Sequence, residues 1–209
     1  LLPEGTTLAQ FTDQYIQSSQ KVGPSMADDI KNAAFLAVVF AMFCMAAYIL
    51  LRFRDISFSV GAFASVAVTT LCIISFYTLL WKVLPFSMEV DQTFIAAILT
   101  IIGYSINDTV VVFDRIRETI GLYPKRDRYQ VINDALNSTL SRTFNTSLTT
   151  LVVVLCIFIL GGATIRSFTF AILLGIIIGT YSTLFVATPI AYELQKKKIN
   201  KKAAAEAGK

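Results

Sequence analysis

Five apolar segments dominate the chain, and each is long enough to cross a lipid bilayer as a helix. A hydrocarbon core of about 30 Å needs roughly 20 helical residues. A chain of 209 residues that is 55% hydrophobic and only 15% charged has too little polar surface for a soluble fold of this size. We therefore predict an all-α membrane protein, a five-span transmembrane helical bundle. The predicted spans cover residues 33–51, 56–81, 92–113, 143–165 and 167–192.

Lysine and arginine are distributed unequally between the connections of these spans. Most of the 18 basic residues fall after the first span, between the third and fourth spans, or after the fifth. Positively charged loops tend to stay in the cytoplasm. The N-terminus of this chain is therefore predicted outside the cytoplasm and the C-terminus inside it.

The polar parts of the chain complete the predicted domain organisation. Residues 1–31 are too few to form a core of their own, so we expect the tail of an outer domain, cut from a longer protein. Residues 127–141 carry apolar side chains at helical spacing, which predicts an amphipathic helix on the cytoplasmic membrane face. Residues 195–209 form a basic tail, which favours contact with membrane lipids. Nucleic acid is not expected as a partner, because no aromatic platform accompanies the lysines.

Asp108 is the only residue among Asp, Glu, Lys and Arg within the five predicted spans. A charged side chain in the bilayer costs about 2.5–3.5 kcal/mol on insertion scales, and aspartate is too short to reach the headgroups from this depth. Its side chain is therefore expected to face protein or water. Tyr104 and Ser105 lie one helical turn before it and Asn107 is adjacent, which predicts a polar seam on that side of the third span.

The fourth span offers a second polar face, which is predicted to lie opposite Asp108. Its guanidinium, amide and hydroxyl side chains recur at helical spacing: Arg142, Asn145, Thr146 and Thr149. In the fifth span, Gly175, Gly179 and Thr183 form a small-residue face of the kind that allows close helix packing.

A buried carboxyl can serve two purposes. Low polarity disfavours its charged form, so it can take up a proton from one side of the membrane and release it to the other. Intramembrane acids mark such proton relays in pumps and transporters. The alternative is that Asp108 only joins neighbouring helices through hydrogen bonds.

No other chemistry is predicted. The chain has no histidine, no glycine-rich phosphate loop and no cluster of carboxylates, so we expect no catalytic residue, no metal site and no enzymatic activity. The three cysteines lie in apolar runs and are expected to act as small packed residues. Asp114 and Arg115 are interpreted mainly as part of the solvated end of the third span.

The run GYSINDTVVVFDRIRE, from Gly103 to Glu118, resembles the signature of SecF, the smaller half of the bacterial SecDF protein-export accessory. The segment SRTFNTSLTTLVVVLCIFILGG, from Ser141, is similar to the fifth helix of that family, and the closing helix with its lysine-rich end also fits. The resemblance implies that the first SecF helix, most of the periplasmic domain and the SecD half are missing. Residues 1–31 would be the tail of that periplasmic domain, and the five spans would be the second to sixth SecF helices.

The resemblance also implies a function. SecDF is similar to transporters of the RND superfamily, in which two pseudo-symmetric halves form one transmembrane domain, here in the bacterial inner membrane. The complex would use proton motive force to pull preprotein across the membrane beside the SecYEG translocon, with SecA and YajC as further partners. Asp108 matches the family's intramembrane aspartate, and Asn107, Thr109, Asp114 and Arg115 match the rest of the motif. No cofactor beyond the coupled proton is implied.

Two other functions stay open at this point. A related RND transporter of small molecules or lipids would keep the intramembrane acid but would need large periplasmic substrate-binding domains. A non-conducting scaffold would stabilise the translocon without moving protons.

Overall fold

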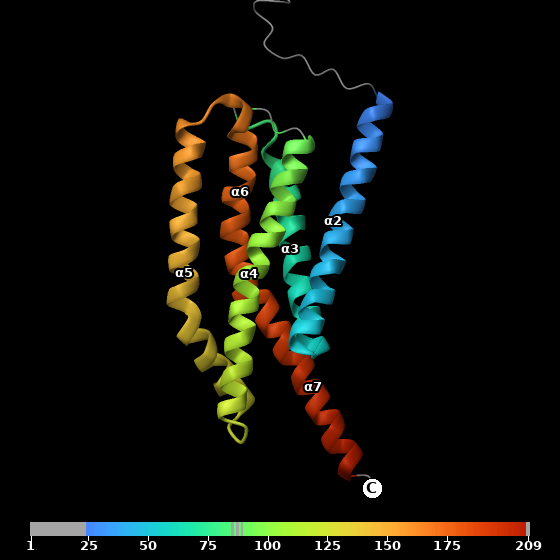
Figure 1. The fold of residues 1–209 in the computed structure, drawn as a ribbon, viewed down its shortest axis with the longest axis vertical. Helices are drawn as coiled ribbons and strands as arrows, with labels where there is room; N and C mark the ends of the chain where they lie inside the picture. Colours follow the sequence, from blue (N-terminus) through green and yellow to red (C-terminus); the bar gives the residue numbers. More distant parts are fainter. Residues whose placement is uncertain (1–23, 85, 87, 89, 208–209) are drawn as a thin grey trace, which may run out of the picture. The chain divides into compact units, whose positions relative to one another are not determined.

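The computed structural model describes residues 24–84, 86, 88 and 90–207, and these residues form helices without a β-strand (Figure 1). The helices are α2 (Pro24–Phe53), α3 (Ile56–Leu80), α4 (Gln92–Leu122), α5 (Arg128–Leu160), α6 (Ala163–Ser182), the π-helical segment η1 (Thr183–Ala187) and α7 (Thr188–Ala207). Five segments of the described residues are long and apolar enough to cross a membrane, which confirms the predicted all-α membrane fold. The chain divides into two units, Leu1–Phe35 and Leu36–Lys209, and the packing of the bundle belongs to the second unit.

Aspartates begin three of the helices. Asp55, Asp91 and Asp127 precede α3, α4 and α5, and each carboxylate accepts a hydrogen bond from a first-turn backbone N–H, at 3.2, 2.8 and 3.4 Å respectively. Such N-caps satisfy donors that the helix itself leaves unpaired. The turns at Asp55 and Asp127 lie at one end of the bundle, called here the Asp55 end. The turn at Gly161 lies at the other, called the Gly161 end.

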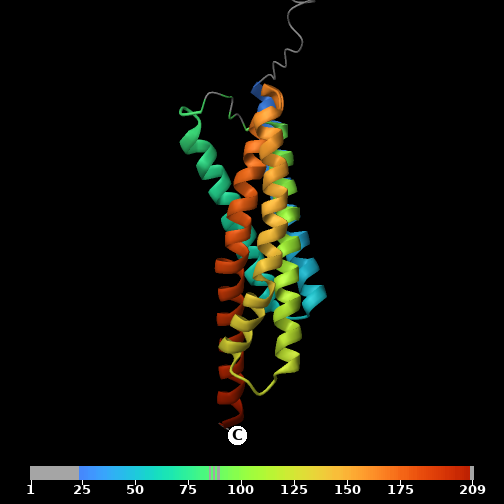
Figure 2. The same ribbon diagram turned by 90° about the vertical axis from the view of Figure 1, so that its left-hand side faces the viewer.

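Two helices at the Asp55 end are longer than the predicted spans. α4 continues to Leu122 and stops shortly before Pro124, because proline cannot continue a helix. The expected amphipathic helix of residues 127–141 and the fourth span form one continuous helix, α5. Figure 2 shows the short connection that returns the chain from α4 into α5 at this end.

The remaining boundaries also differ from the sequence prediction. α5 ends at Leu160 rather than at residue 165, because Gly161 turns the chain and a Cβ atom there would overlap the Ile157 carbonyl oxygen. α7 runs on to Ala207, so the expected basic tail is helical to that residue. Most of the expected outer tail, residues 1–31, lies outside the described residues, but α2 already begins at Pro24.

α4 and α6 run parallel and form the most extensive helix contact of the bundle (Figure 1). The contact keeps a constant register along α6 and into η1. Gly175 meets Ile101, Gly179 meets Ser105, and Thr183 of η1 meets Thr109. A Cβ atom on Gly175 would overlap the buried Ile101 side chain. This geometry confirms the packing interpretation of the small-residue face in the fifth span.

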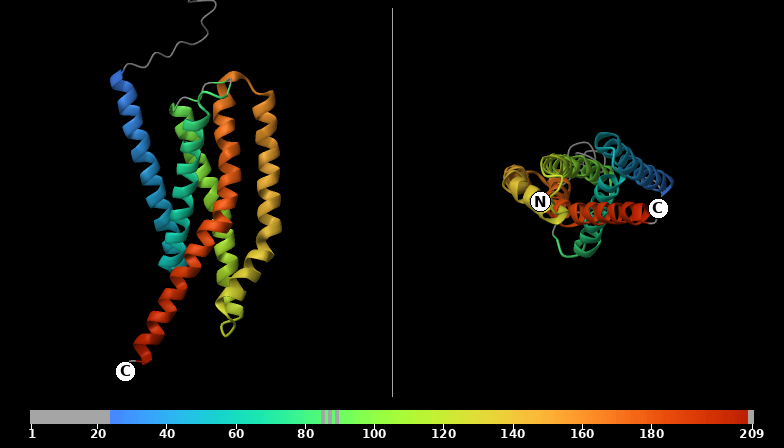
Figure 3. Two further views of the ribbon diagram at one scale, coloured as in Figure 1. Left: turned by 180° about the vertical axis from the view of Figure 1, so that it is seen from behind. Right: turned by 90° about the horizontal axis from the view of Figure 1, so that it is seen from below.

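The π-helical segment η1 lies where the chain passes α3. A Cβ atom on Gly61 of α3 would come within 2.6 Å of the Ala187 carbonyl oxygen, so the backbones approach closely there. Ser182 Oγ donates a hydrogen bond to the Ser65 carbonyl oxygen at 3.0 Å. Figure 3 shows that α7 leaves the direction of α6 at this point. A π-helical insertion and a change of helix direction therefore coincide with tight contact to α3.

Candidate functional site

Asp108 is the only buried charged side chain among the residues that the structure describes, with 8% of its surface exposed. It lies on α4, on the face that also carries Ser105 and Thr109, both buried. The same register places Ser105 against Gly179 of α6 and Thr109 against Thr183 of η1. The sequence prediction that this side chain faces protein is therefore confirmed.

One hydroxyl of α5 reaches Asp108, and that hydroxyl is itself paired with one of α6. Ser147 of α5 donates a hydrogen bond to Asp108 Oδ2 over 3.4 Å, and Ser147 Oγ lies 2.7 Å from Thr180 Oγ1 of α6. The chain Asp108–Ser147–Thr180 thus connects α4, α5 and α6. At 3.4 Å the bond to the carboxyl is long, so the serine can re-orient between its two partners at small cost.

A second hydroxyl pair lies one residue further along α4. Thr109 Oγ1 and Thr183 Oγ1 are 3.0 Å apart, and both side chains are fully buried. Two further buried hydroxyls, those of Ser105 and Thr143, have no hydrogen-bond partner among the described residues. Buried polar groups normally require partners, so these hydroxyls give the surroundings of Asp108 unused hydrogen-bonding capacity.

The predicted wall on the fourth span is not the one that meets Asp108. Arg142, Asn145, Thr146 and Thr149 are all exposed on α5, and the threonine hydroxyls bond to carbonyls of their own helix. The buried face of α5 instead carries Thr143 and Ser147. The sequence spacing correctly indicated a polar face on this helix, but the predicted face is the exposed one. Thr143 and Ser147 repeat with the same four-residue period as the predicted residues, so spacing could not distinguish the two faces. Only Arg142 of the predicted set interacts electrostatically with Asp108.

Two residues of the predicted seam on the third span lie away from the carboxyl. Asn107 is exposed on α4. Tyr104 is half-buried, and its hydroxyl donates to the Thr146 carbonyl oxygen at 3.4 Å and to Thr150 Oγ1 at 3.3 Å. The structure therefore brings Ser105 and Thr109 to the site but leaves Asn107 and Tyr104 on the side facing the exposed polar strip of α5.

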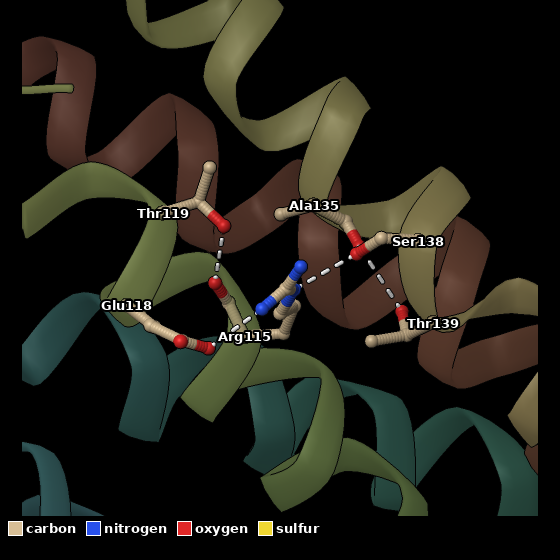
Figure 4. Close-up of polar contacts among 6 residues, drawn as sticks. All are labelled: Arg115, Glu118, Thr119, Ala135, Ser138 and Thr139. Carbon is tan, nitrogen blue, oxygen red and sulfur yellow. Dashed lines mark hydrogen bonds and ion pairs between the residues drawn. The ribbon is translucent and has the colours of Figure 1, made fainter. Parts of the chain in front are cut away.

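Asp114 and Arg115 form contacts between helices at the Asp55 end. Asp114 Oδ2 accepts a hydrogen bond from Arg52 Nη2 of α2 at 3.0 Å. In Figure 4, Arg115 lies between the acid Glu118 on its own helix, at 2.8 Å, and the Ser138 hydroxyl on α5, at 2.9 Å. These exposed contacts join α4 to α2 and α5, and they are separate from the carboxyl of Asp108.

An open cavity also lies at this end. It has a volume of about 500 Å³ and lies between α4 and α5, with Arg142 and Asp114 among its lining residues. Val111, about one helical turn from Asp108 along α4, is also among its lining residues. The cavity thus comes within about one turn of Asp108 along α4.

The fold and this site define a multi-pass helical membrane protein with a protected acid in its interior. The family model described as protein export membrane protein SecD/SecF, C-terminal, matches residues 5–197. The protein translocase subunit SecF of Rhodothermus marinus is 46% identical over 186 residues, which are 89% of this chain and 60% of that protein. SecF of Petrotoga mobilis is 40% identical over 90% of this chain and 61% of the relative.

A solved structure agrees with these sequence relatives. The crystal structure of SecDF in a super-membrane-facing form is similar with a TM-score of 0.75 and 33% identity, over 95% of this chain and 27% of that chain. The chain belongs to the SecD/SecF protein-export membrane family and is of the SecF type. It spans only about 60% of the length of the SecF relatives named above.

Proposed function

We propose that this chain is the SecF part of a proton-driven accessory of Sec protein export, and that Asp108 carries the proton. The observation that supports this most strongly is the burial of a single carboxyl among hydroxyl groups in a membrane-spanning helix. An acid in this setting destabilises the inserted helix, and such residues in membrane proteins generally have a function. Its neutral form can hydrogen-bond to Ser147, and its charged form can be balanced by Arg142.

The orientation of the chain follows from its basic residues. The side chains of Arg52, Arg115, Arg117 and Lys198 all lie at the Asp55 end. Under the positive-inside rule this end is cytoplasmic, so the Gly161 end faces the periplasm of a bacterial inner membrane. The cavity beside Val111 would then deliver protons to, or remove them from, the cytoplasmic side.

A partner half is needed to cover the exposed polar strip of α4 and α5. Asn107, Asn145, Thr146 and Thr149 lie within the predicted spans and are exposed. Amide groups cannot face hydrocarbon without cost, so a second protein surface is expected against them. We infer a SecD-type half as that partner, forming with this chain an RND-type pseudo-symmetric domain, and the SecYEG translocon, preprotein, SecA and YajC as further partners.

The decisive test substitutes Asp108 by asparagine in the full-length protein expressed with its partner half. Asp108→Asn keeps the size of the side chain but cannot exchange a proton. Reconstituted vesicles with a pH-sensitive dye measure proton movement, and a preprotein translocation assay measures export. We expect both activities to fall to background while the protein still inserts and elutes as a single species.

Asp114→Asn is the matched control, because it removes the same charge from an exposed site of the same helix. It should leave proton movement largely intact. Undiminished export in Asp108→Asn would refute the proposal. A wild-type protein that supports export without moving protons would instead identify the non-conducting scaffold, and transport of a small molecule or lipid without preprotein would identify the other RND function.

A further inference from the structure

A basic pocket lies at the Asp55 end, separate from Asp108. It has a volume of about 280 Å³ and lies where the end of α2, the start of α3, the end of α4, the start of α5 and α7 meet. Three cationic side chains line it, Arg117, Arg128 and Lys198, together with one carboxylate, Asp55. The lining therefore carries a net charge of +2, with Gln195 as an additional neutral donor.

Most of the hydrogen-bond donors of these cations are not committed to other groups. Lys198 Nζ lies 3.3 Å from Asp55 Oδ1, and one nitrogen of Arg117 donates to the Arg52 carbonyl oxygen at 3.4 Å. Arg128 has no carboxylate within ion-pair distance among the described residues. A guanidinium carries five donors in a planar fork that matches phosphate oxygens, so two arginines here can bind an anionic group together.

Part of the pocket lining is apolar. Phe53 and Phe58, whose ring centres are 5.3 Å apart, line the pocket and are otherwise buried. Ile120 of α4 and Ile199 of α7 complete the apolar part of the lining, and the Ile199 side chain is 44% exposed. A charged rim with an adjoining apolar lining suits a molecule that has both an anionic head and hydrocarbon chains.

We propose that this pocket binds the phosphate group of an anionic phospholipid, with the start of its acyl chains against the apolar lining residues. Basic pockets between membrane helices at the headgroup level attract anionic lipids, each basic residue contributing about 1 kcal/mol. Free inorganic phosphate would use the rim but not the apolar lining. An acidic protein segment would use the charge but would not need hydrocarbon beside it.

Lipid retention by the purified full-length protein tests this. Native mass spectrometry of protein taken from mixed micelles compares retention of phosphatidylglycerol with that of zwitterionic phosphatidylethanolamine. Wild type should retain the anionic lipid preferentially. Arg117→Gln/Arg128→Gln should lower that retention by about tenfold or more, since two basic contacts are lost. Lys125→Gln/Arg126→Gln is the matched control, because it removes the same charge from the exposed α4–α5 turn, outside both the pocket and the basic tail, and it should change retention little.

A variant with the opposite expected effect separates lipid binding from misfolding. Asp55→Asn keeps an N-cap acceptor for α3 but removes the one negative charge of the pocket, so phosphatidylglycerol retention should rise. Equal loss in the pocket and control double variants would overturn the proposal, as would unchanged or reduced retention in Asp55→Asn. Displacement of bound phosphatidylglycerol by millimolar inorganic phosphate would identify a phosphate site instead. Displacement by an acidic peptide alone would identify a protein-docking surface.

Discussion

Ser147 Oγ lies 3.4 Å from Asp108 Oδ2, so a serine of α5 supplies the side-chain hydrogen bond to the buried acid. The same hydroxyl lies 2.7 Å from Thr180 on α6. A proton that arrives at or leaves Asp108 changes which of these groups donates. The hydrogen bonding of three helices therefore depends on the protonation of one carboxyl, which fits the proposed coupling of proton passage to helix movement.

Removing the Ser147 hydroxyl should weaken this link without unfolding the protein. In Ser147→Ala we expect the rate of proton movement by the full-length protein and its partner half to fall about two- to tenfold. This corresponds to the loss of one buried hydrogen bond, which contributes roughly 0.5–1.5 kcal/mol. The measurement is dye-reported proton uptake in reconstituted vesicles. Ser75→Ala is the control, since that exposed hydroxyl bonds only to the Leu71 carbonyl of its own helix. Equal rates in the two variants would contradict the role given to Ser147.

The α4–α6 contact predicts opposite effects for two glycine substitutions. In Gly175→Ala the new methyl group overlaps Ile101, so the free energy of unfolding should fall by about 1–3 kcal/mol. Gly103 has open space around its Cβ position, and Gly103→Ala should be neutral or stabilise by up to about 1 kcal/mol. Thermal unfolding in detergent compares them, and identical melting temperatures would show that the register of α4 on α6 is wrong.

The ion pair between Arg52 and Asp114 should contribute little to stability despite its 3.0 Å separation. Both side chains are about 40% exposed, so water screens the attraction, and exposed pairs are worth at most about 1 kcal/mol. A double-mutant cycle with Arg52→Gln and Asp114→Asn measures the coupling free energy by chemical unfolding. A coupling well above 1 kcal/mol would mean that a partner surface buries this pair in the complete protein.

The proposed orientation can be tested with single cysteines. In a protein whose own cysteines are replaced by alanine, Lys82→Cys lies at the Gly161 end and Lys196→Cys at the Asp55 end. A membrane-impermeant maleimide applied to intact spheroplasts should label residue 82 and should label residue 196 only after the membrane is opened. The reverse pattern would invert the topology, and with it the side of the membrane that the Val111 cavity serves.

Much of this architecture could be predicted from the chain alone. The position of a spanning helix depends on the free energy of transfer into the bilayer, summed over about 20 consecutive residues. This sum needs no knowledge of tertiary contacts, so the five helices are found where the apolar runs are. The isolation of Asp108 was equally visible, because no other Asp, Glu, Lys or Arg falls within a predicted span. Helix ends were less predictable: α4 runs to Leu122 because a helix can continue beyond the bilayer until a proline stops it.

Only the tertiary structure decided which side chains surround the acid. Both faces of α5 carry hydroxyl groups at four-residue spacing, so periodicity alone could not distinguish Ser147 from Thr146. The choice depends on how α5 is rotated about its own axis, and that rotation is set by packing against α4 and α6, where the glycines of α6 permit close approach. Contacts between helices distant in sequence determine this rotation, and no local sum of residue properties contains them.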